Sequence, residues 1–263
     1  MENLAVEPSS ILITGAAGAI GSALAAEYAG SGVHLHLGDR TGTSLDLVAD
    51  ECRRRGAQAW TDFGDVRQPD RMSDWVHQAD ARAPLDLIVL LAGVSHGDLE
   101  RDETPEQTRE VFGVNLDGML NVLLPALRLF RERRRGQVAL MSSLAGTRGL
   151  PHAPSYSATK AAVRVYGEAL RLRLRREQVG VSVINPGFIE SPMTRSNRFP
   201  MPFLVTTEKA AKVIRRGLAR DQGQIAFPWP MALGAWLLST VHSRVFQFFA
   251  APRGSRPGPP TAS

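Results

Sequence analysis

The chain has 263 residues, 43% of them hydrophobic, and a formal net charge of +5. This length suits one large α/β domain and is short for two. The positive charge does not indicate nucleic-acid binding, because it comes from arginines spread along predicted helices, and Lys160, Lys209 and Lys212 are the only lysines.

Apolar strands and helices alternate along most of the chain. In chain order, we expect strand Ser10–Thr14, helix Ala19–Ser31, strand Val33–Gly38, helix Ser44–Arg55, strand Ala57–Phe63, helix Asp70–Gln78, strand Leu85–Ala92, helix Pro105–Arg133, strand Gln137–Met141, helix Ser155–Arg176 and strand Val181–Ile184. Continuous apolar strands joined by helices indicate a parallel sheet covered on both faces. The sequence therefore predicts a doubly wound, Rossmann-type α/β fold, with a single domain over residues 1–250.

The ends of the chain and its cysteine content favour a cytoplasmic protein. The N-terminus lacks a basic segment followed by an apolar one, which is the pattern of a secretory signal. Cys52 is the only cysteine, so no disulfide can form within the chain. Residues 251–263 are rich in Pro, Gly and Ser, and we expect them to be a disordered tail.

A glycine-rich turn, TGAAGAIG at residues 14–21, separates the first strand from the first helix. Glycine lets the backbone turn sharply, and the N–H groups at a helix N-terminus attract a pyrophosphate. The turn therefore predicts a dinucleotide site, although a tight turn without a ligand is the alternative. The residues expected at the cofactor here are Gly15, Ala17, Gly18, Ala19, Ile20 and Gly21.

The end of the second strand bears on which dinucleotide binds. Asp39 can accept hydrogen bonds from the adenosine ribose and would repel a 2′-phosphate, so we expect NAD rather than NADP. Arg40 follows directly and would pair with a 2′-phosphate if Asp39 turned away. Asp65 and Val66, after the third strand, are candidates for contact with the adenine, with a surface turn as the alternative.

Tyr156 and Lys160 lie four residues apart at the start of a predicted helix and so share one face. A phenol has a pKa near 10, which an adjacent ammonium group lowers. Tyr156 could then take a proton from an alcohol, or give one to a ketone, while hydride moves. The alternative for this pair is two solvated residues on a helix surface.

Ser143 and Asn115 complete the candidate site. Ser143 follows the fifth strand, where its hydroxyl could hold the substrate oxygen beside Tyr156; the adjacent Ser142 is an alternative. Asn115 lies inside a long predicted helix, where an amide side chain competes for backbone hydrogen bonds. A helical kink holding a water linked to Lys160 would explain it, and a tolerated structural Asn is the alternative.

These motifs occur in an order that resembles the short-chain dehydrogenase/reductase superfamily, in its single-domain branch. The resemblance covers about Ser10 to Ala226. The matching motifs are Thr14–Gly21, Leu91-Ala92-Gly93, Asn115, Ser143, Tyr156 with Lys160, and Asn185-Pro186-Gly187. The resemblance implies a catalytic tetrad of Asn115, Ser143, Tyr156 and Lys160, and further cofactor contacts at Ala92, Gly93, Pro186, Gly187 and Ile189.

Two positions depart from the family pattern. Ala19 stands where this branch usually has a glycine, a spacing more like that of the longer, extended branch. Leu90 and Leu91 replace the usual paired Asn before Ala92-Gly93, which removes a polar side chain that helps to order the central strands. We expect the second change to affect stability more than chemistry.

The family resemblance also implies a substrate lid, here residues 188–205, and homodimers or homotetramers formed through helices Pro105–Arg133 and Ser155–Arg176. The lid is mostly apolar, which indicates a lipophilic alcohol or ketone unless these side chains only pack the lid on the body. His34 and His36 share a strand face, but two ligands do not make a metal site, and we expect none.

The C-terminal segment 225–250 is apolar and rich in Phe and Trp. Burial of its helix, Met231–Val241, on the body or in a subunit interface is the favoured expectation, and peripheral membrane contact is the alternative. Pro228 and Pro230 leave the helix too short to span a bilayer.

Together these features predict an NAD(P)-dependent oxidoreductase that acts on alcohols or ketones. The alternatives are a non-catalytic dinucleotide-binding sensor or scaffold, and a dehydratase or epimerase that uses bound cofactor transiently. The sequence does not name the substrate.

Overall fold

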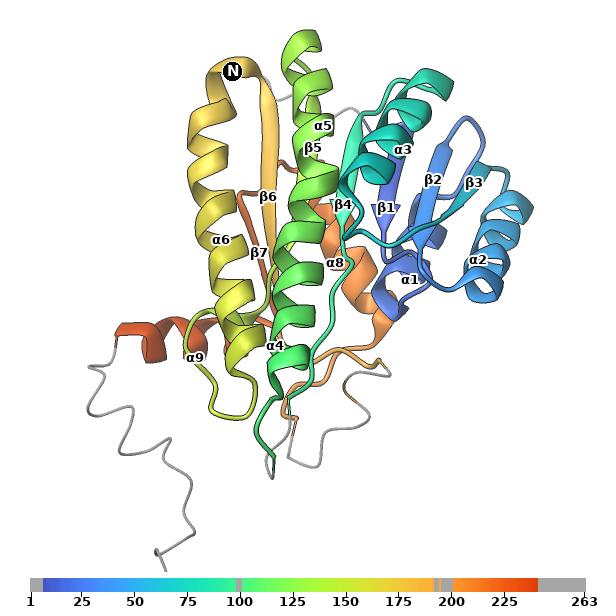
Figure 1. Cartoon of the computed structure of the whole chain (residues 1–263). Coiled ribbons are helices and arrows are strands. Elements are labelled where there is room, and N and C mark those ends of the chain that lie inside the picture. The colour runs from blue at the N-terminus through green and yellow to red at the C-terminus, as the bar shows by residue number, and fades with distance from the viewer. Residues whose placement is uncertain (1–6, 98–100, 192–193, 195–200, 241–263) are drawn as a thin grey trace, which may run out of the picture.

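Figure 1 shows the computed structural model of the chain, in which helices cover both faces of a parallel sheet. The model describes residues 7–97, 101–191, 194 and 201–240. Seven strands lie in the order β3-β2-β1-β4-β5-β6-β7, and every neighbouring pair is parallel. The predicted doubly wound fold is therefore confirmed.

The elements follow the predicted alternation. The strands are β1 (Ser10–Thr14), β2 (His34–Asp39), β3 (Gln58–Phe63), β4 (Leu87–Leu90), β5 (Gly136–Met141), β6 (Val179–Pro186) and β7 (Gln224–Phe227). The α-helices are α1 (Ala19–Tyr28), α2 (Gly42–Arg54), α3 (Pro69–Arg82), α4 (Pro105–Phe112), α5 (Gly118–Arg133), α6 (Pro154–Leu174), α8 (Thr207–Ala219) and α9 (Trp229–Thr240). A π-helical turn, η1 (Gly113–Asp117), joins α4 to α5, and two short 3₁₀ turns are η2 (Leu144–Gly146) and η3 (Arg175–Glu177).

Two hydrophobic layers hold the helices on the sheet. On one face, side chains such as Ile13 and Leu35 pack against α1, α2 and α8. On the other face, side chains such as Leu12 and Ile88 pack against α3, α5 and α6. The run 105–133 is, in the described part of the chain, the one helical segment long and apolar enough to span a bilayer by composition. Its α5 part lies over the sheet with Phe130 fully buried, as expected of a core helix.

Four elements differ from the sequence expectation. The strand expected over Leu85–Ala92 covers only Leu87–Leu90, and beyond it the amides of Leu91 and Ala92 both bond to the Thr14 hydroxyl. No element was expected for α8, and β7 was not separated from the apolar segment that follows it. The expected helix through Asn115 is interrupted by the π-helical turn.

The C-terminal helix is not buried on the body, and its burial in a subunit interface, the other half of the favoured expectation, stays a prediction. Within 225–240, only β7 enters the core, where Ile225 and Phe227 are buried beside β6. The helix α9 that follows has no buried residue. The rest of the expected apolar segment, from residue 241, and the expected tail at 251–263 lie outside the described residues.

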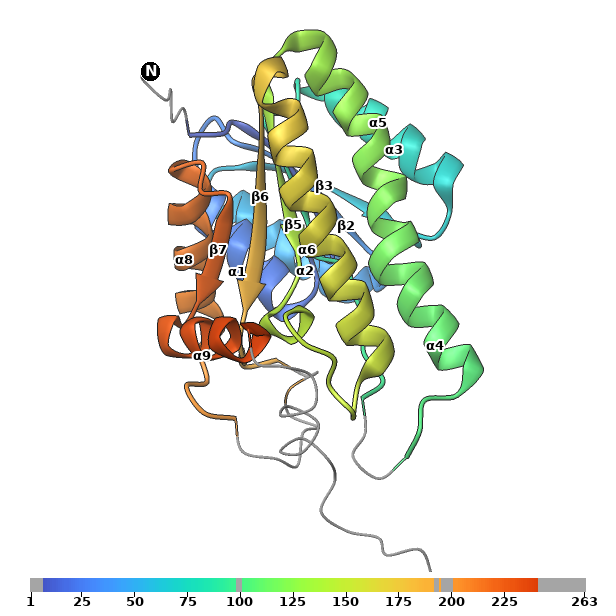
Figure 2. The same ribbon diagram turned by 90° about the vertical axis from the view of Figure 1, so that its left-hand side faces the viewer.

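The strand order places a crevice at one edge of the sheet. The chain leaves β1 toward β2 on one side and returns to β4 on the other, and ligands bind outside the carboxyl ends of strands at such a reversal. In Figure 2 the strand carboxyl ends gather at the lower edge, where α4 and α6 also begin. The glycine turn, Ser143 and Tyr156 are all brought to this edge.

A buried histidine on the α3 face makes stability depend on pH. His36 is fully buried and stacks on Trp60 at 5.0 Å between ring centroids, and its ring nitrogens have no hydrogen-bond partner among the described residues. Burial, with smaller contributions from the charges of Arg82 and His34, lowers its pKa from 6.5 to about 4, and Asp80 acts in the opposite direction. The folded state therefore holds His36 neutral in a pH range where the unfolded chain binds a proton.

We expect this difference to destabilise the protein as pH falls from 6.5 toward 4. From pH 7 to pH 5 the His36 contribution to the free energy of unfolding should fall by about 2 kcal/mol. Urea unfolding at the two pH values measures this difference. Between pH 7 and pH 5, His36→Phe, which keeps a ring against Trp60, should lose about 2 kcal/mol less stability than the wild type. His77→Phe, at an exposed histidine of α3, should retain the wild-type pH dependence. Equal pH dependence in the wild type and His36→Phe would contradict the assignment.

Candidate active site

The glycine turn between β1 and α1 is packed so closely that side chains are excluded. Gly15 has φ +68°, and a Cβ atom there would lie 2.9 Å from the Ala92 nitrogen. A Cβ atom on Gly21 would lie 2.2 Å from the Gly15 carbonyl oxygen. Gly18 is the N-cap of α1 and has no side chain to cap the helix, so the first N–H groups of α1, including those of Ala19 and Ile20, lack intrahelical acceptors. This is the arrangement that a pyrophosphate needs.

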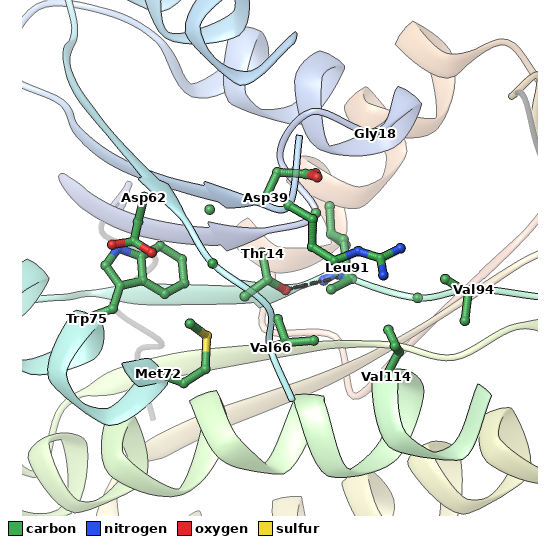
Figure 3. Close-up of a pocket in the computed structure, with 16 residues that line it drawn as sticks. Thr14, Gly18, Asp39, Asp62, Val66, Met72, Trp75, Leu91, Val94 and Val114 are labelled. Carbon is green, nitrogen blue, oxygen red and sulfur yellow. Dashed lines mark hydrogen bonds between the residues drawn. The ribbon is translucent and has the colours of Figure 1, made fainter. Parts of the chain in front are cut away.

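A pocket lies beside this turn, at the crevice between β1 and β4 (Figure 3). Its lining includes seven of the predicted cofactor residues: Gly15, Gly18, Asp39, Arg40, Val66, Ala92 and Gly93. Thr14 lies at its floor, where its hydroxyl accepts hydrogen bonds from the amides of Leu91 and Ala92 at 3.1 and 3.2 Å. The closely packed glycines and the uncapped helix start fit a dinucleotide.

Asp39 connects the end of β2 to the glycine turn. One carboxylate oxygen accepts a hydrogen bond from the Ala17 amide at 3.0 Å, and the other accepts two from Thr41. The oxygen that accepts from Ala17 keeps a further acceptor site for a ribose hydroxyl. The neighbouring Arg40 points to Glu110 of α4, with 3.7 Å between the nearest nitrogen and oxygen.

Asp65 and Val66 take different positions. Val66 lines the pocket, whereas the Asp65 carboxylate is held by the Arg67 guanidinium and backbone amide. These bonds, together with burial in the opposite sense, leave the pKa of Asp65 below its ordinary value. The structure thus places Val66, and not the Asp65 carboxylate, at the pocket.

Asn115 lies in the π-helical turn, so the helical break expected there is present. Its side chain is buried and bonds to both backbone groups of Val94, accepting from the amide at 2.8 Å and donating to the carbonyl at 3.0 Å. It also donates to the Thr159 hydroxyl of α6 at 3.2 Å. Asn115 thereby connects the segment after β4 to the helix that carries Tyr156.

The two candidate serines have distinct partners. The Ser142 hydroxyl donates to the Lys160 backbone carbonyl at 2.7 Å inside the protein, so it is committed to holding α6. The Ser143 hydroxyl accepts from the Ala145 amide, donates weakly to the Pro186 carbonyl at 3.4 Å, and bonds to the Tyr156 side chain. Geometry therefore favours Ser143 as the serine that reaches substrate.

Tyr156 and Lys160 share one face of α6, as expected. The Lys160 Nζ lies 5.5 Å from the centre of the Tyr156 ring and donates to the Met141 carbonyl at 2.9 Å. A Cβ atom on Gly93 would lie 3.1 Å from the Asn115 Oδ1 and 3.4 Å from the Lys160 Nζ, so both groups meet at Gly93.

The expected lowering of the Tyr156 pKa is not seen in the structure. Burial raises the pKa of Tyr156, and the hydrogen bond with Ser143 offsets only part of that rise. Burial also lowers the pKa of Lys160 to about 8. Desolvation is the largest cause of the pKa change at both groups, which sequence spacing could not indicate.

The segment after β6 reaches the same edge of the sheet. Pro186 is the last residue of β6, and the Gly187 amide donates to the Phe227 carbonyl at 2.7 Å. Ile189 is buried in the hydrophobic core and pairs with Val205 across an isolated bridge. Its side chain does not line the described pocket, so its cofactor contact remains a prediction. Of the expected lid, residues 192, 193 and 195–200 lie outside the described residues.

Comparison with known proteins decides the family. The family model for short chain dehydrogenases matches residues 9–201. The chain belongs to the short-chain dehydrogenase family. An uncharacterized oxidoreductase of Myxococcus xanthus is 35% identical to it over 237 residues, covering 89% of this chain and 93% of the relative.

Other relatives of this short-chain dehydrogenase agree in fold. An 11-beta-hydroxysteroid dehydrogenase-like protein of Arabidopsis thaliana is 30% identical, covering 90% of this chain and 82% of that protein. The crystal structure of a short chain dehydrogenase from Mycobacterium paratuberculosis bound to NAD superposes with a TM-score of 0.73 at 24% identity, covering 83% of this chain and 94% of that one. The family binds NAD or NADP and carries out oxidoreduction.

Sequence reasoning missed several residues of this short-chain dehydrogenase. Trp75 and Met72 of α3 line the pocket, and Trp75 fills the space that Gly38 leaves by lacking a side chain. Nothing in the spacing of α3 marks them as different from core residues. Thr159 could have been noticed, since it lies between Tyr156 and Lys160 on the helix that Asn115 must reach.

Proposed function

We propose that this short-chain dehydrogenase transfers hydride between NAD and a lipophilic alcohol or ketone, with Tyr156 as the general acid and base. The observation that carries the proposal is the convergence of Tyr156, Lys160, Ser143 and Asn115 at the sheet edge that also holds the glycine turn. These groups come from three separate parts of the chain: η1, the turn after β5, and α6. Packing alone does not require them to meet beside the uncapped start of α1.

Each residue has a distinct part in the proposed chemistry. Bound NAD supplies the hydride acceptor. In alcohol oxidation, Tyr156 takes the hydroxyl proton while Ser143 donates a hydrogen bond to the same oxygen; in ketone reduction, Tyr156 returns the proton. Lys160, which is cationic below about pH 8, stabilises the phenolate beside it. Asn115 is a positioning residue, because it holds Val94 and Thr159 rather than a reacting atom.

The proposed preference for NAD rests on Asp39 and on a charge pair across the pocket mouth. Glu110 of α4 accepts from His96 at 2.8 Å and pairs with Arg40. The hydrogen bond from His96, with Arg40 and Arg67 nearby, holds the pKa of Glu110 below its ordinary value, so the carboxylate is ionised at neutral pH. Glu110 therefore competes with a 2′-phosphate for Arg40, the one residue in this loop that could favour NADP.

Glu110→Gln should accordingly raise the affinity for NADP by about threefold to tenfold while changing NAD affinity little, since an exposed ion pair contributes up to about 1 kcal/mol. Titration of each cofactor by protein fluorescence measures this directly. Glu106→Gln, at an acidic residue one turn earlier on α4, should leave both affinities unchanged. NADP affinity that stays the same in Glu110→Gln would contradict the role of the pair.

A lipophilic substrate is proposed from the part of the lid that the structure describes. Phe203 and Leu204 are exposed beside the strand ends, and Val205 anchors the segment in the core. An apolar segment at the edge where Ser143 and Tyr156 lie favours apolar substrates over sugars or acids. The Arabidopsis relative's name includes hydroxysteroid dehydrogenase, which supports this class.

We also propose a homo-oligomer formed through α5 and α6. Exposed apolar side chains lie on the outer surface of these helices, namely Leu124 on α5 with Val165 and Leu172 on α6. Val165 and Leu172 are two turns apart and so share one face of α6. A second copy on this surface would cover all three.

The proposed function is tested by following cofactor absorbance across a panel of lipophilic alcohols and ketones. We expect turnover with NAD that depends on Ser143 and much less on Ser142. Cofactor binding without turnover of any member of the panel would favour a sensor or scaffold. Product formation without net change in cofactor would favour a dehydratase or epimerase.

A further inference from the structure

We propose that α9, together with Phe203 and Leu204, is a docking surface for a lipid bilayer with anionic headgroups. Its role in substrate delivery rests on the proposed function, whereas the docking itself does not.

Large apolar side chains gather on this edge of the molecule. Of the exposed large hydrophobic residues in the described chain, seven lie between 203 and 238: Phe203, Leu204, Trp229, Leu233, Trp236, Leu237 and Leu238. Trp229 is 74% exposed and Trp236 is 61% exposed, unusual for the largest apolar side chain. Five of the seven lie on the single helix α9, and exposed apolar side chains grouped in this way mark a site of interaction.

Four of the exposed residues of α9 form a stripe. Trp229, Leu233, Trp236 and Leu237 recur at spacings of three and four and therefore share one face of the helix. The opposite side rests on the body through Met231, whose sulfur would lie 2.8 Å from a Cβ atom on Gly187. No residue of α9 carries a formal charge. A helix that is apolar on every side is normally buried by protein or lipid. The body of the protein contacts α9 on one side only.

The sequence from Asp221 to the C-terminus is positively charged, which favours lipid with negative headgroups. After Asp221 the sequence has no acidic residue as far as Ser263. The same stretch carries Arg244, Arg253 and Arg256, and residues 245–249 read VFQFF. A stretch that combines aromatic residues with arginines and has no carboxylate suits the boundary between anionic headgroups and acyl chains.

The backbone of Phe203 supports an external role for its ring. Phe203 has φ +58°, a left-handed conformation that is an outlier for a bulky residue, and its side chain is 59% exposed. Bending the chain in this way directs an aromatic ring to solvent with no gain in packing. A bilayer surface would supply the missing contact.

The surface lies at the entrance to the candidate site. In Figure 2, α9 crosses beneath the carboxyl ends of β6 and β7, close to the start of α6. It contacts η2, which directly follows Ser143, and Gly187, which follows β6. A protein docked by this surface would open its substrate site toward the bilayer, from which a lipophilic alcohol or ketone could enter without crossing water.

The test is flotation of the full-length protein with vesicles of zwitterionic phosphatidylcholine, with and without anionic phosphatidylglycerol. We expect wild type to float with the anionic vesicles and to be released by high salt. Leu233→Gln/Leu237→Gln should lower the vesicle partition coefficient by about tenfold or more, since two leucines leave the acyl boundary. Trp236→Gln gives an independent disruption. Leu47→Gln, at a still more exposed leucine on α2, should float as wild type does.

The outcomes separate docking from catalysis. Tyr156→Phe should float like wild type even though it is inactive, so failure of the proposed chemistry leaves this proposal testable. Wild type that ignores anionic vesicles, or an α9 double variant that still floats, overturns it. A double variant that only reduces the particle mass in sedimentation, while wild type does not float, assigns the surface to a second copy instead.

Discussion

Replacing Tyr156 by Phe is expected to lower kcat by about 10²- to 10⁴-fold, the usual contribution of a positioned general acid or base. The substitution removes one oxygen and keeps the ring that packs beside Lys160. Ser143 would still bond the substrate oxygen, so the loss falls on proton transfer. The KM for NAD should change far less than kcat.

The measurement is initial rates for the wild type and the variant with the best substrate of the panel. Tyr166→Phe, nearly three turns further along α6 and on a different side of the helix from Tyr156, is the matched control and should retain wild-type kcat. Thermal unfolding of both variants should match wild type, since neither loses packing volume. Turnover by Tyr156→Phe at the wild-type rate would remove Tyr156 from the chemistry.

Gly21→Ala is expected to lower both stability and cofactor use. The added Cβ would lie 2.2 Å from the Gly15 carbonyl oxygen and 2.8 Å from the Ala16 Cα, and both are backbone atoms. The turn must move to accept it, which should cost about 1–3 kcal/mol of unfolding free energy. Because the turn positions the cofactor, kcat/KM for NAD should fall by about a hundredfold.

Gly30→Ala is the matched control at the other end of the same helix, where an added Cβ meets nothing within 4 Å. It should unfold at the wild-type urea concentration or slightly above it. Isothermal titration with NAD separates lost binding from lost catalysis in the Gly21 variant. Wild-type NAD affinity in Gly21→Ala would show that the turn is not the pyrophosphate site.

The fold and the central part of the candidate site could be predicted because local pattern determines them. Apolar strands alternating with helices require a covered parallel sheet, and strand order then brings residues at strand ends together. Gly15 and Gly21 mark positions of the turn where a Cβ atom would come within 3 Å of backbone atoms. Tyr156 and Lys160 share a helix face by spacing alone.

What could not be predicted depends on the environment that packing creates. The pKa directions of Tyr156 and Lys160 follow from burial, which spacing does not contain. Whether Ser142 or Ser143 faces the site depends on the Lys160 carbonyl that captures the Ser142 hydroxyl. The apolar composition of α9 predicts a buried helix, but the structure leaves α9 without a buried residue. An apolar helix is usually buried unless something outside the chain covers it.

The measurement that bears most directly on the whole account is transfer of deuterium from NADH deuterated at the reactive carbon to a ketone of the panel, read by mass spectrometry of the product. We predict one deuterium on the new carbinol carbon in the wild type, and about a hundredfold less labelled product, or lower, with Tyr156→Phe over the same time. Unlabelled product, or NADH that binds at the glycine turn and never gives up its label, would contradict hydride transfer by this site.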